Sequence, residues 1–186
     1  MPKTLILFHS RWGATAALAD AIADGARALR FSEVAVRRLD HPAPDDLGDA
    51  TPEQLAARAA LLARYSPLDH VEELAQYDGI ILGAPSGSGD VSPELQRVLE
   101  KAEALWANGT FANTVGSAFA AASAGPSAHE AIRWSLLRSM ANLGMILVPA
   151  PSGGADHESA ERQGRRVAEL VSWVAHARSH AHAHTH

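Results

Sequence analysis

The chain has 186 residues, enough for one domain somewhat larger than average. Its net charge is −5 without a basic stripe, and no apolar run approaches the ~20 residues of a membrane span, so we expect neither nucleic-acid nor membrane binding. The absence of cysteine excludes disulfides and thiol chemistry, and with an N-terminus that lacks a signal-peptide pattern it leads us to expect a cytoplasmic protein.

The first half of the chain alternates between strand and helix patterns. Residues 4–9 are continuously hydrophobic, as in a parallel strand buried on both faces, and a helical pattern follows to about Leu29. Residues 34–39 are predicted as a second strand. A loop rich in Pro, Asp and Gly then leads to a helix over residues 51–63, with Thr51 as its cap and Pro52 at its first position.

The second half continues the alternation. The predicted elements are a short helical turn at 71–76, a strand at 79–83, a helix at 92–105, a strand at 115–122, a helix at 128–143, a strand at 145–148 and a helix at 158–176. Gly144 stands where a glycine after a helix is expected.

Alternating strands and helices indicate a parallel sheet with helices on both faces. Because crossovers are right-handed, we expect a flavodoxin-like, doubly wound α/β domain over residues 1–176, with five strands in the order 2-1-3-4-5. We expect residues 177–186 to form a disordered, His-rich tail that binds metals only adventitiously. Ligands of such sheets bind beyond the carboxyl ends of the strands, where loops 10–15, 85–90 and 123–127 would lie.

The first of these loops is suited to a phosphate. A helix start offers unpaired N–H groups and a positive dipole, and the hydroxyls of Ser10 and Thr15, together with the flexible Gly13, can surround an anion. Arg11 would add positive charge. The alternative is an ordinary turn in which Ser10 caps the helix. The Walker and dinucleotide signatures are both absent.

The second and third loops are suited to a flat ring. Gly83, Gly87 and Gly89 let the backbone approach a ring closely, and its N–H groups are suited to the polar edge of a flavin. The alternative is a flexible turn before the helix that Ser92 begins. The third loop would line the same crevice through Ser123, Ala124 and Gly125.

Three longer segments are the most specific pattern in the chain: residues 77–85 (YDGIILGAP), 105–109 (LWANG) and 143–149 (LGMILVP). They resemble segments that the WrbA family writes as Tyr-Asp-(Ala/Gly)-Ile-Ile-Phe-Gly-Thr-Pro, Leu-Trp-Ala-Ser-Gly and His-Gly-Met-Val-Ile-Val-Pro. That family comprises flavodoxin-like NAD(P)H:quinone oxidoreductases, and the resemblance extends from residue 4 to about residue 174.

The resemblance implies an FMN enzyme that passes a hydride from NAD(P)H to FMN and then to a quinone, commonly as a homo-oligomer, either a dimer or a tetramer. It implies a phosphate site and a ring site, made respectively by Ser10, Trp12, Gly13, Ala14 and Thr15, and by Pro85, Ser86, Gly87, Ser88 and Gly89. Trp106 would wall the pocket for quinone and nicotinamide. His129 is a further candidate for contact with the quinone, and no metal site is expected.

The chain also differs from the family pattern. Gly87-Ser88 replaces the usual Arg-Phe, Asn142-Leu143 replaces His-His, and residues 151–157 replace a long Gly-rich loop. These differences favour an alternative, a non-enzymatic binding or assembly module that has lost or weakened FMN binding. A one-electron carrier like flavodoxin would be more acidic and would have an aromatic residue in the second loop.

Several other residues have plain structural interpretations. Trp134 and Trp173 lie at apolar helix positions and are interpreted as core or interface residues, whereas Asp20 and Asp24 are interpreted as a solvated helix face. An adjacent pair on a helix does not share a face, so His129 and Glu130 are not expected to act jointly.

Overall fold

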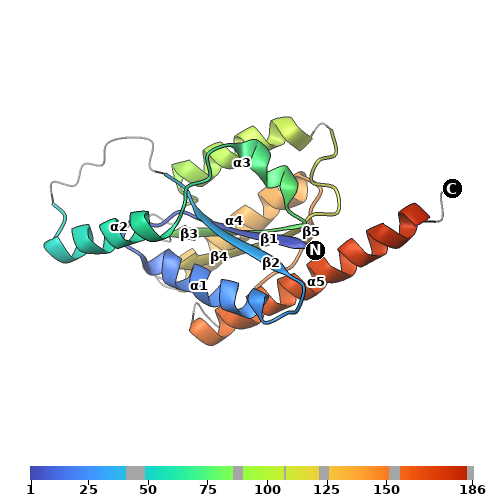
Figure 1. Ribbon diagram of the computed structural model, residues 1–186. Helices are drawn as coiled ribbons and strands as arrows, with labels where there is room; N and C mark the ends of the chain where they lie inside the picture. Colours follow the sequence, from blue (N-terminus) through green and yellow to red (C-terminus); the bar gives the residue numbers. More distant parts are fainter. Residues whose placement is uncertain (41–48, 86–89, 107, 122–125, 151–155, 184–186) are drawn as a thin grey trace.

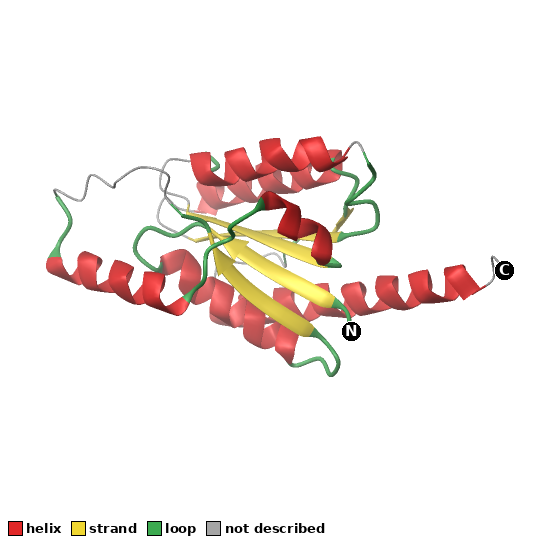
Figure 2. Ribbon diagram, turned by 45° about the horizontal axis from the view of Figure 1, so that its top comes forward, coloured by secondary structure: helices red, strands yellow, loops and turns green. Residues whose placement is uncertain are grey.

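The computed structural model describes residues 1–40, 49–85, 90–106, 108–121, 126–150 and 156–183. Its centre is a five-stranded parallel sheet in the order β2-β1-β3-β4-β5, seen edge-on in Figure 1 and more openly in Figure 2. The strands are β1 (Lys3–Phe8), β2 (Glu33–Arg38), β3 (Gly79–Pro85), β4 (Val115–Ala121) and β5 (Ile146–Leu147). The predicted fold class and strand order are therefore confirmed.

Helices cover both faces of the sheet. They are α1 (Ala14–Arg27), α2 (Pro52–Arg64), η1 (Val71–Gln76), α3 (Pro93–Trp106), α4 (Pro126–Asn142) and α5 (His157–Ala183), where η1 is a 3-10 helix. Figure 1 shows α1 and α5 on one side of the sheet, with α3 and α4 on the other. Thr51 caps α2 as predicted, since its hydroxyl accepts a hydrogen bond from the Gln54 amide in a capping box.

The hydrophobic run of β1 serves two cores. Leu5 and Leu7 belong to the apolar cluster that includes residues of α3 and α4, whereas Ile6 and Phe8 belong to the cluster that includes residues of α1 and α5. Successive side chains of a strand point to opposite faces, so a strand covered on both sides is apolar at every position. The site described below lies at the carboxyl end of this strand.

Two glycines allow α1 and α5 to pack with their backbones in close approach. A Cβ added at Gly25 would lie 1.9 Å from the Glu161 carbonyl oxygen, and one added at Gly164 would lie 1.9 Å from the Ile22 carbonyl oxygen. The approach brings the start of α5 to the same end of the sheet as the start of α1.

The C-terminal segment differs from the prediction. Helix α5 continues to Ala183, so residues 177–183 are helical instead of disordered, and the helix projects beyond the body of the domain in Figure 1. After Gly164 the helix contains neither glycine nor proline, and adding a residue to an existing helix costs far less than starting one. The end of the expected tail, residues 184–186, is outside the described residues.

Two further expectations are corrected at the surface. Trp134 and Trp173 are 56% and 58% exposed, so neither belongs to the core, and the interpretation as interface residues remains. Asp20 is not simply solvated, because its carboxylate accepts a hydrogen bond of 2.9 Å from the Tyr65 hydroxyl and pairs with Arg64 at 2.9 Å. Within the described part of the chain, every helix is too short or too polar to cross a bilayer.

Candidate functional site

The carboxyl ends of β1, β3 and β4 lie side by side, as the sequence predicted for the three candidate loops. Phe8 is paired with Gly83, and Gly83 with Phe119, so the loops leave neighbouring points of one sheet edge. The His9 amide donates a hydrogen bond of 3.0 Å to the Gly83 carbonyl just beyond the pairing. Predicted residues outside the described part of the chain are Ser86, Gly87, Ser88, Gly89, Ser123, Ala124 and Gly125.

The turn from β1 into α1 has the features of an anion site. Gly13 is the N-cap residue of α1 with a φ of 103°, a conformation that only glycine adopts readily, and a Cβ added there would meet nothing within 4 Å. Ser10 does not cap the helix; its hydroxyl oxygen accepts a hydrogen bond of 3.0 Å from the Gly13 amide. The first turn carries neither a side-chain cap nor an acidic residue, so its amides and positive dipole fit the phosphate of FMN.

The other residues of the phosphate prediction take different places. Ala14 is the first residue of α1, and Thr15 is almost fully buried in the following position. The Arg11 guanidinium lies 4.9 Å from the centroid of the Trp12 ring, a cation–π contact. Arg11 and Trp12 line a polar cleft of about 290 Å³ between this turn and the start of α2, together with Asp49, Ala50 and Gln54. Arg11 and Asp49 therefore bring one charge of each sign to this cleft, and a phosphate contact by Arg11 stays a prediction.

The start of α3 contains a buried polar group of residues. Ser92, at 8% exposed, has a buried hydroxyl without a hydrogen-bond partner, and Glu94, at 6% exposed, lies 3.4 Å from His9 (Oε2 to Nδ1). Pro85 is the last residue of β3 and the first residue of the predicted second loop, residues 85–90, which we call the ring loop. Ser92 follows that loop in the chain. The Ser92 hydroxyl is an available polar contact at the edge where the flavin ring is expected. His9 and Glu94 could not be predicted from the sequence, because nothing in their local patterns shows that they meet.

His129 is buried beside a small cavity between α4 and α5. Its Nε2 atom and the Nε atom of Arg133 have no hydrogen-bond partner, and both residues line the cavity with Asp156, Ser159 and Gln163. The cavity holds about 20 Å³, which is room for one water molecule. Trp106, the other predicted catalytic residue, is the last residue of α3.

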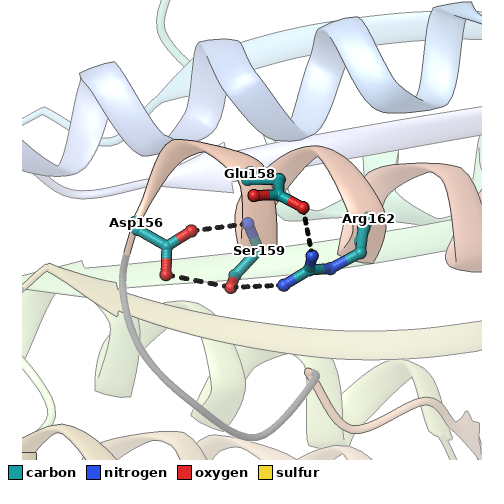
Figure 3. A network of polar contacts seen from close by, with 4 residues as sticks. All are labelled: Asp156, Glu158, Ser159 and Arg162. Carbon is teal, nitrogen blue, oxygen red and sulfur yellow. Dashed lines mark hydrogen bonds and ion pairs between the residues drawn. The ribbon is translucent and has the colours of Figure 1, made fainter.

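A polar network fixes the start of α5 next to this cavity (Figure 3). The Asp156 carboxylate accepts hydrogen bonds from the Ser159 amide at 2.8 Å and from the Ser159 hydroxyl at 3.0 Å. These bonds lower the pKa of Asp156 below its usual value, so the cap remains ionised. Arg162 donates to the Ser159 hydroxyl and pairs with Glu158, which completes the network.

A second buried network joins α5 to the sheet. The Gln163 side-chain amide donates to the Ser117 hydroxyl at 2.9 Å and to the Ala118 carbonyl at 3.0 Å, and the Ser117 hydroxyl donates to the Val148 carbonyl at 2.6 Å. The Gln163 amide thus supplies a hydrogen bond to the Ala118 carbonyl of β4, beyond the two residues of β4 that pair with β5. The partners are separated by about 30 to 46 positions, so sequence patterns do not reveal them.

Comparison with known proteins agrees with this architecture. The chain is 32% identical to a protein of Cupriavidus metallidurans named "NAD(P)H dehydrogenase (quinone)" over 151 residues, which cover 81% of this chain and 72% of the relative. The protein of the same name from Acidithiobacillus ferrooxidans is also 32% identical, over the same shares of the two chains.

Solved structures show the same fold at lower identity. The flavodoxin, WrbA-like protein from Agrobacterium tumefaciens superposes with a TM-score of 0.64 at 20% identity, covering 93% of this chain and 99% of that one. A flavodoxin from the domain Archaea superposes with a TM-score of 0.59 at 18% identity, covering 91% and 99%.

The family model supplies the most direct assignment. The model described as "NADPH-dependent FMN reductase" matches residues 8–160, from the last residue of β1 into α5. This range contains all three loops at the carboxyl edge of the sheet, and it agrees with the expectation of an NAD(P)H-dependent flavin enzyme. The chain belongs to the NADPH-dependent FMN reductase family.

Proposed function

We propose that the protein is an FMN-dependent NAD(P)H:quinone oxidoreductase related to the WrbA family. The observation that carries the proposal is the start of α1, which has a positive-φ glycine, no side-chain cap and no acidic residue in its first turn. An anion satisfies such a helix start. The family and the names of its relatives support a flavin phosphate as that anion and a quinone as the acceptor.

The proposed cofactor contacts are assigned to the loops at the carboxyl edge of the sheet. Phosphate contacts are assigned to Ser10, Arg11, Trp12, Gly13, Ala14 and Thr15, and ring contacts to Pro85, Ser86, Gly87, Ser88, Gly89, Ser123, Ala124 and Gly125. Bound FMN supplies the two-electron chemistry between NAD(P)H and the quinone. The protein binds and orients the reactants. We assign contact with the quinone to His129 and, because α3 ends at the opposite edge of the sheet, to Trp106 of a second copy of the chain.

We also propose that the protein functions as a homo-oligomer. Trp134 on α4 and Trp173 on α5 are more than half exposed, and a second copy of the chain that covered either one would bury its apolar area. The alternative function is a non-enzymatic module with weakened flavin binding, which the Gly87-Ser88 substitution in the ring loop favours.

A pair of glycine variants tests the site. Gly13 and Gly109 both have positive φ and open space around an added Cβ, so alanine introduces similar backbone strain at each, about 1 kcal/mol. We expect Gly13→Ala to raise the Kd for FMN at least about tenfold, because the strained turn no longer presents its amides to the phosphate. Gly109→Ala, far from the predicted loops in sequence, should leave the Kd unchanged.

The activity assay distinguishes the two functions. NADPH oxidation with benzoquinone should require added FMN and should fall in Gly13→Ala together with the affinity for FMN. Equal FMN binding by both variants would contradict the phosphate assignment. FMN binding without quinone reduction would instead favour the binding module.

A further inference from the structure

The contact between His9 and Glu94 joins the two halves of the proposed flavin site. His9 is the residue between β1 and Ser10, and Glu94 is the second residue of α3, just after the ring loop. His9 Nδ1 lies 3.4 Å from Glu94 Oε2, and the two residues are only 8% and 6% exposed. The proposed chemistry uses neither of them.

Burial of this pair is costly for a contact that serves stability alone. A buried carboxylate loses its hydration, and the attraction of an ion-pair partner often does no more than offset that loss. Apolar side chains of similar size commonly give equal or higher stability in such places. The dipole of α3 favours a carboxylate in its first turn, but an exposed one would gain from it as well.

The backbone around His9 is fixed on both sides. The His9 amide donates to the Gly83 carbonyl of β3, and the neighbouring Phe8 carbonyl accepts from the Leu39 amide at 2.8 Å. The His9 side chain therefore extends from a strand end that is hydrogen-bonded to both neighbouring segments to the first turn of α3. The turn from β1 into α1, residues 10–15, is called the phosphate turn here. Any shift of the first turn of α3 relative to the phosphate turn has to break or stretch the contact between His9 and Glu94.

We propose that His9 and Glu94 are positioning residues that set the distance between the phosphate turn and the first turn of α3, the helix that follows the ring loop in the chain. Ser10 follows His9 directly, and the ring loop ends just before the helix that carries Glu94. FMN spans both parts, so it binds tightly only when their spacing matches the length of the cofactor. This inference rests on the proposed function.

FMN titration tests the inference with variants that separate positioning from stability. His9→Leu and Glu94→Met should each raise the Kd at least about tenfold, because each removes the buried ion-pair contact and leaves its former partner buried without it. His9→Gln keeps a side-chain N–H and should retain most of the affinity. Glu100→Gln neutralises an exposed carboxylate on the same helix and should change nothing.

The double variant His9→Leu/Glu94→Met gives the decisive comparison. The apoprotein of this double variant should melt at a higher temperature than that of either single variant, close to the wild-type value, because no unpaired charge remains buried. It should not restore FMN affinity if the polar contact sets the spacing. Recovery of wild-type FMN affinity together with stability would overturn the inference.

Hydrogen exchange of the apoprotein provides a readout that does not need FMN. Glu94→Met should speed amide exchange at residues 10–15 and 90–95 and leave α5 unchanged, since only the two tied segments gain freedom. Unchanged exchange in both segments would also overturn the inference. If wild-type protein binds no FMN, the proposed function fails, and exchange alone then decides whether the contact couples the segments.

Discussion

At the scale of single residues, Tyr65 shows how a tertiary contact changes a side chain. Its ring packs edge-on against Phe8 with centroids 5.1 Å apart, and its hydroxyl donates to Asp20. Burial and the hydrogen bond to Asp20 raise the pKa of Tyr65 to about 12, because both favour the neutral phenol. The pKa of an unfolded chain stays near 10.

This shift predicts a specific pH dependence. A group whose folded-state pKa is raised contributes stability below the unfolded pKa and loses that contribution as pH rises through the folded pKa. The free energy of unfolding should therefore fall between about pH 10 and pH 12 through Tyr65. Tyr65→Phe should lack this part of the fall in urea titrations, and Tyr77→Phe, the same change at the other tyrosine, should keep it. If the free energy of unfolding falls equally with pH in Tyr65→Phe and in the wild type, the prediction is wrong.

Residue-scale chemistry was only partly visible in the sequence. The Ser10-to-Gly13 turn could be predicted, because a strand, a glycine and a helix start follow one another in the chain. The Tyr65–Asp20 bond joins positions 45 apart, and the His9–Glu94 contact joins two elements that share no local pattern. Such pairs depend on how distant elements pack.

At the scale of elements, the approach of α1 to α5 depends on Gly25 and Gly164. Alanine is about 1 kcal/mol more favourable than glycine in a helix interior, so helix propensity alone predicts that Gly25→Ala stabilises the protein. The contact predicts the opposite, because the new Cβ would lie 1.9 Å from a backbone oxygen of α5. We expect Gly25→Ala to lower stability by about 1–3 kcal/mol, the range for an overpacked core.

The sign of this change is easily measured. Thermal unfolding of Gly25→Ala should show a lower melting temperature than wild type, and Gly164→Ala should behave in the same way. Ala17→Gly, at an exposed position of α1, measures the helix-propensity difference between alanine and glycine alone. A raised melting temperature in either glycine variant would show that the helices do not require this close approach.

Element boundaries followed from the sequence where apolar runs were long. β1, β3 and β4 were found within two residues because they are buried on both faces and apolar throughout. The edge strand β5 is only two residues long, shorter than predicted, since side-chain bonds from Gln163 and Ser117 replace strand pairing beyond it. The length of α5 was missed because a solvent-facing helix has no apolar pattern to mark its end.

At the scale of the whole molecule, alternation of strands and helices was sufficient to predict the sheet order. The crossover rules leave few arrangements for such a chain, and the observed order places the phosphate turn between β2 and β3. The same rules place the candidate site at the carboxyl edge of the sheet. They do not determine whether the crevice keeps its cofactor, since that depends on loop side chains that differ from those of the family.

Retention of FMN is the most direct test of the account. The purified protein should be mixed with FMN, desalted and examined by absorbance, with the melting temperature recorded before and after. We predict a retained flavin spectrum near one FMN per chain and a higher melting temperature, because a ligand that binds only the folded state stabilises it. A desalted protein without flavin absorbance, and with an unchanged melting temperature at micromolar FMN, would contradict the assignment of this fold to flavin chemistry.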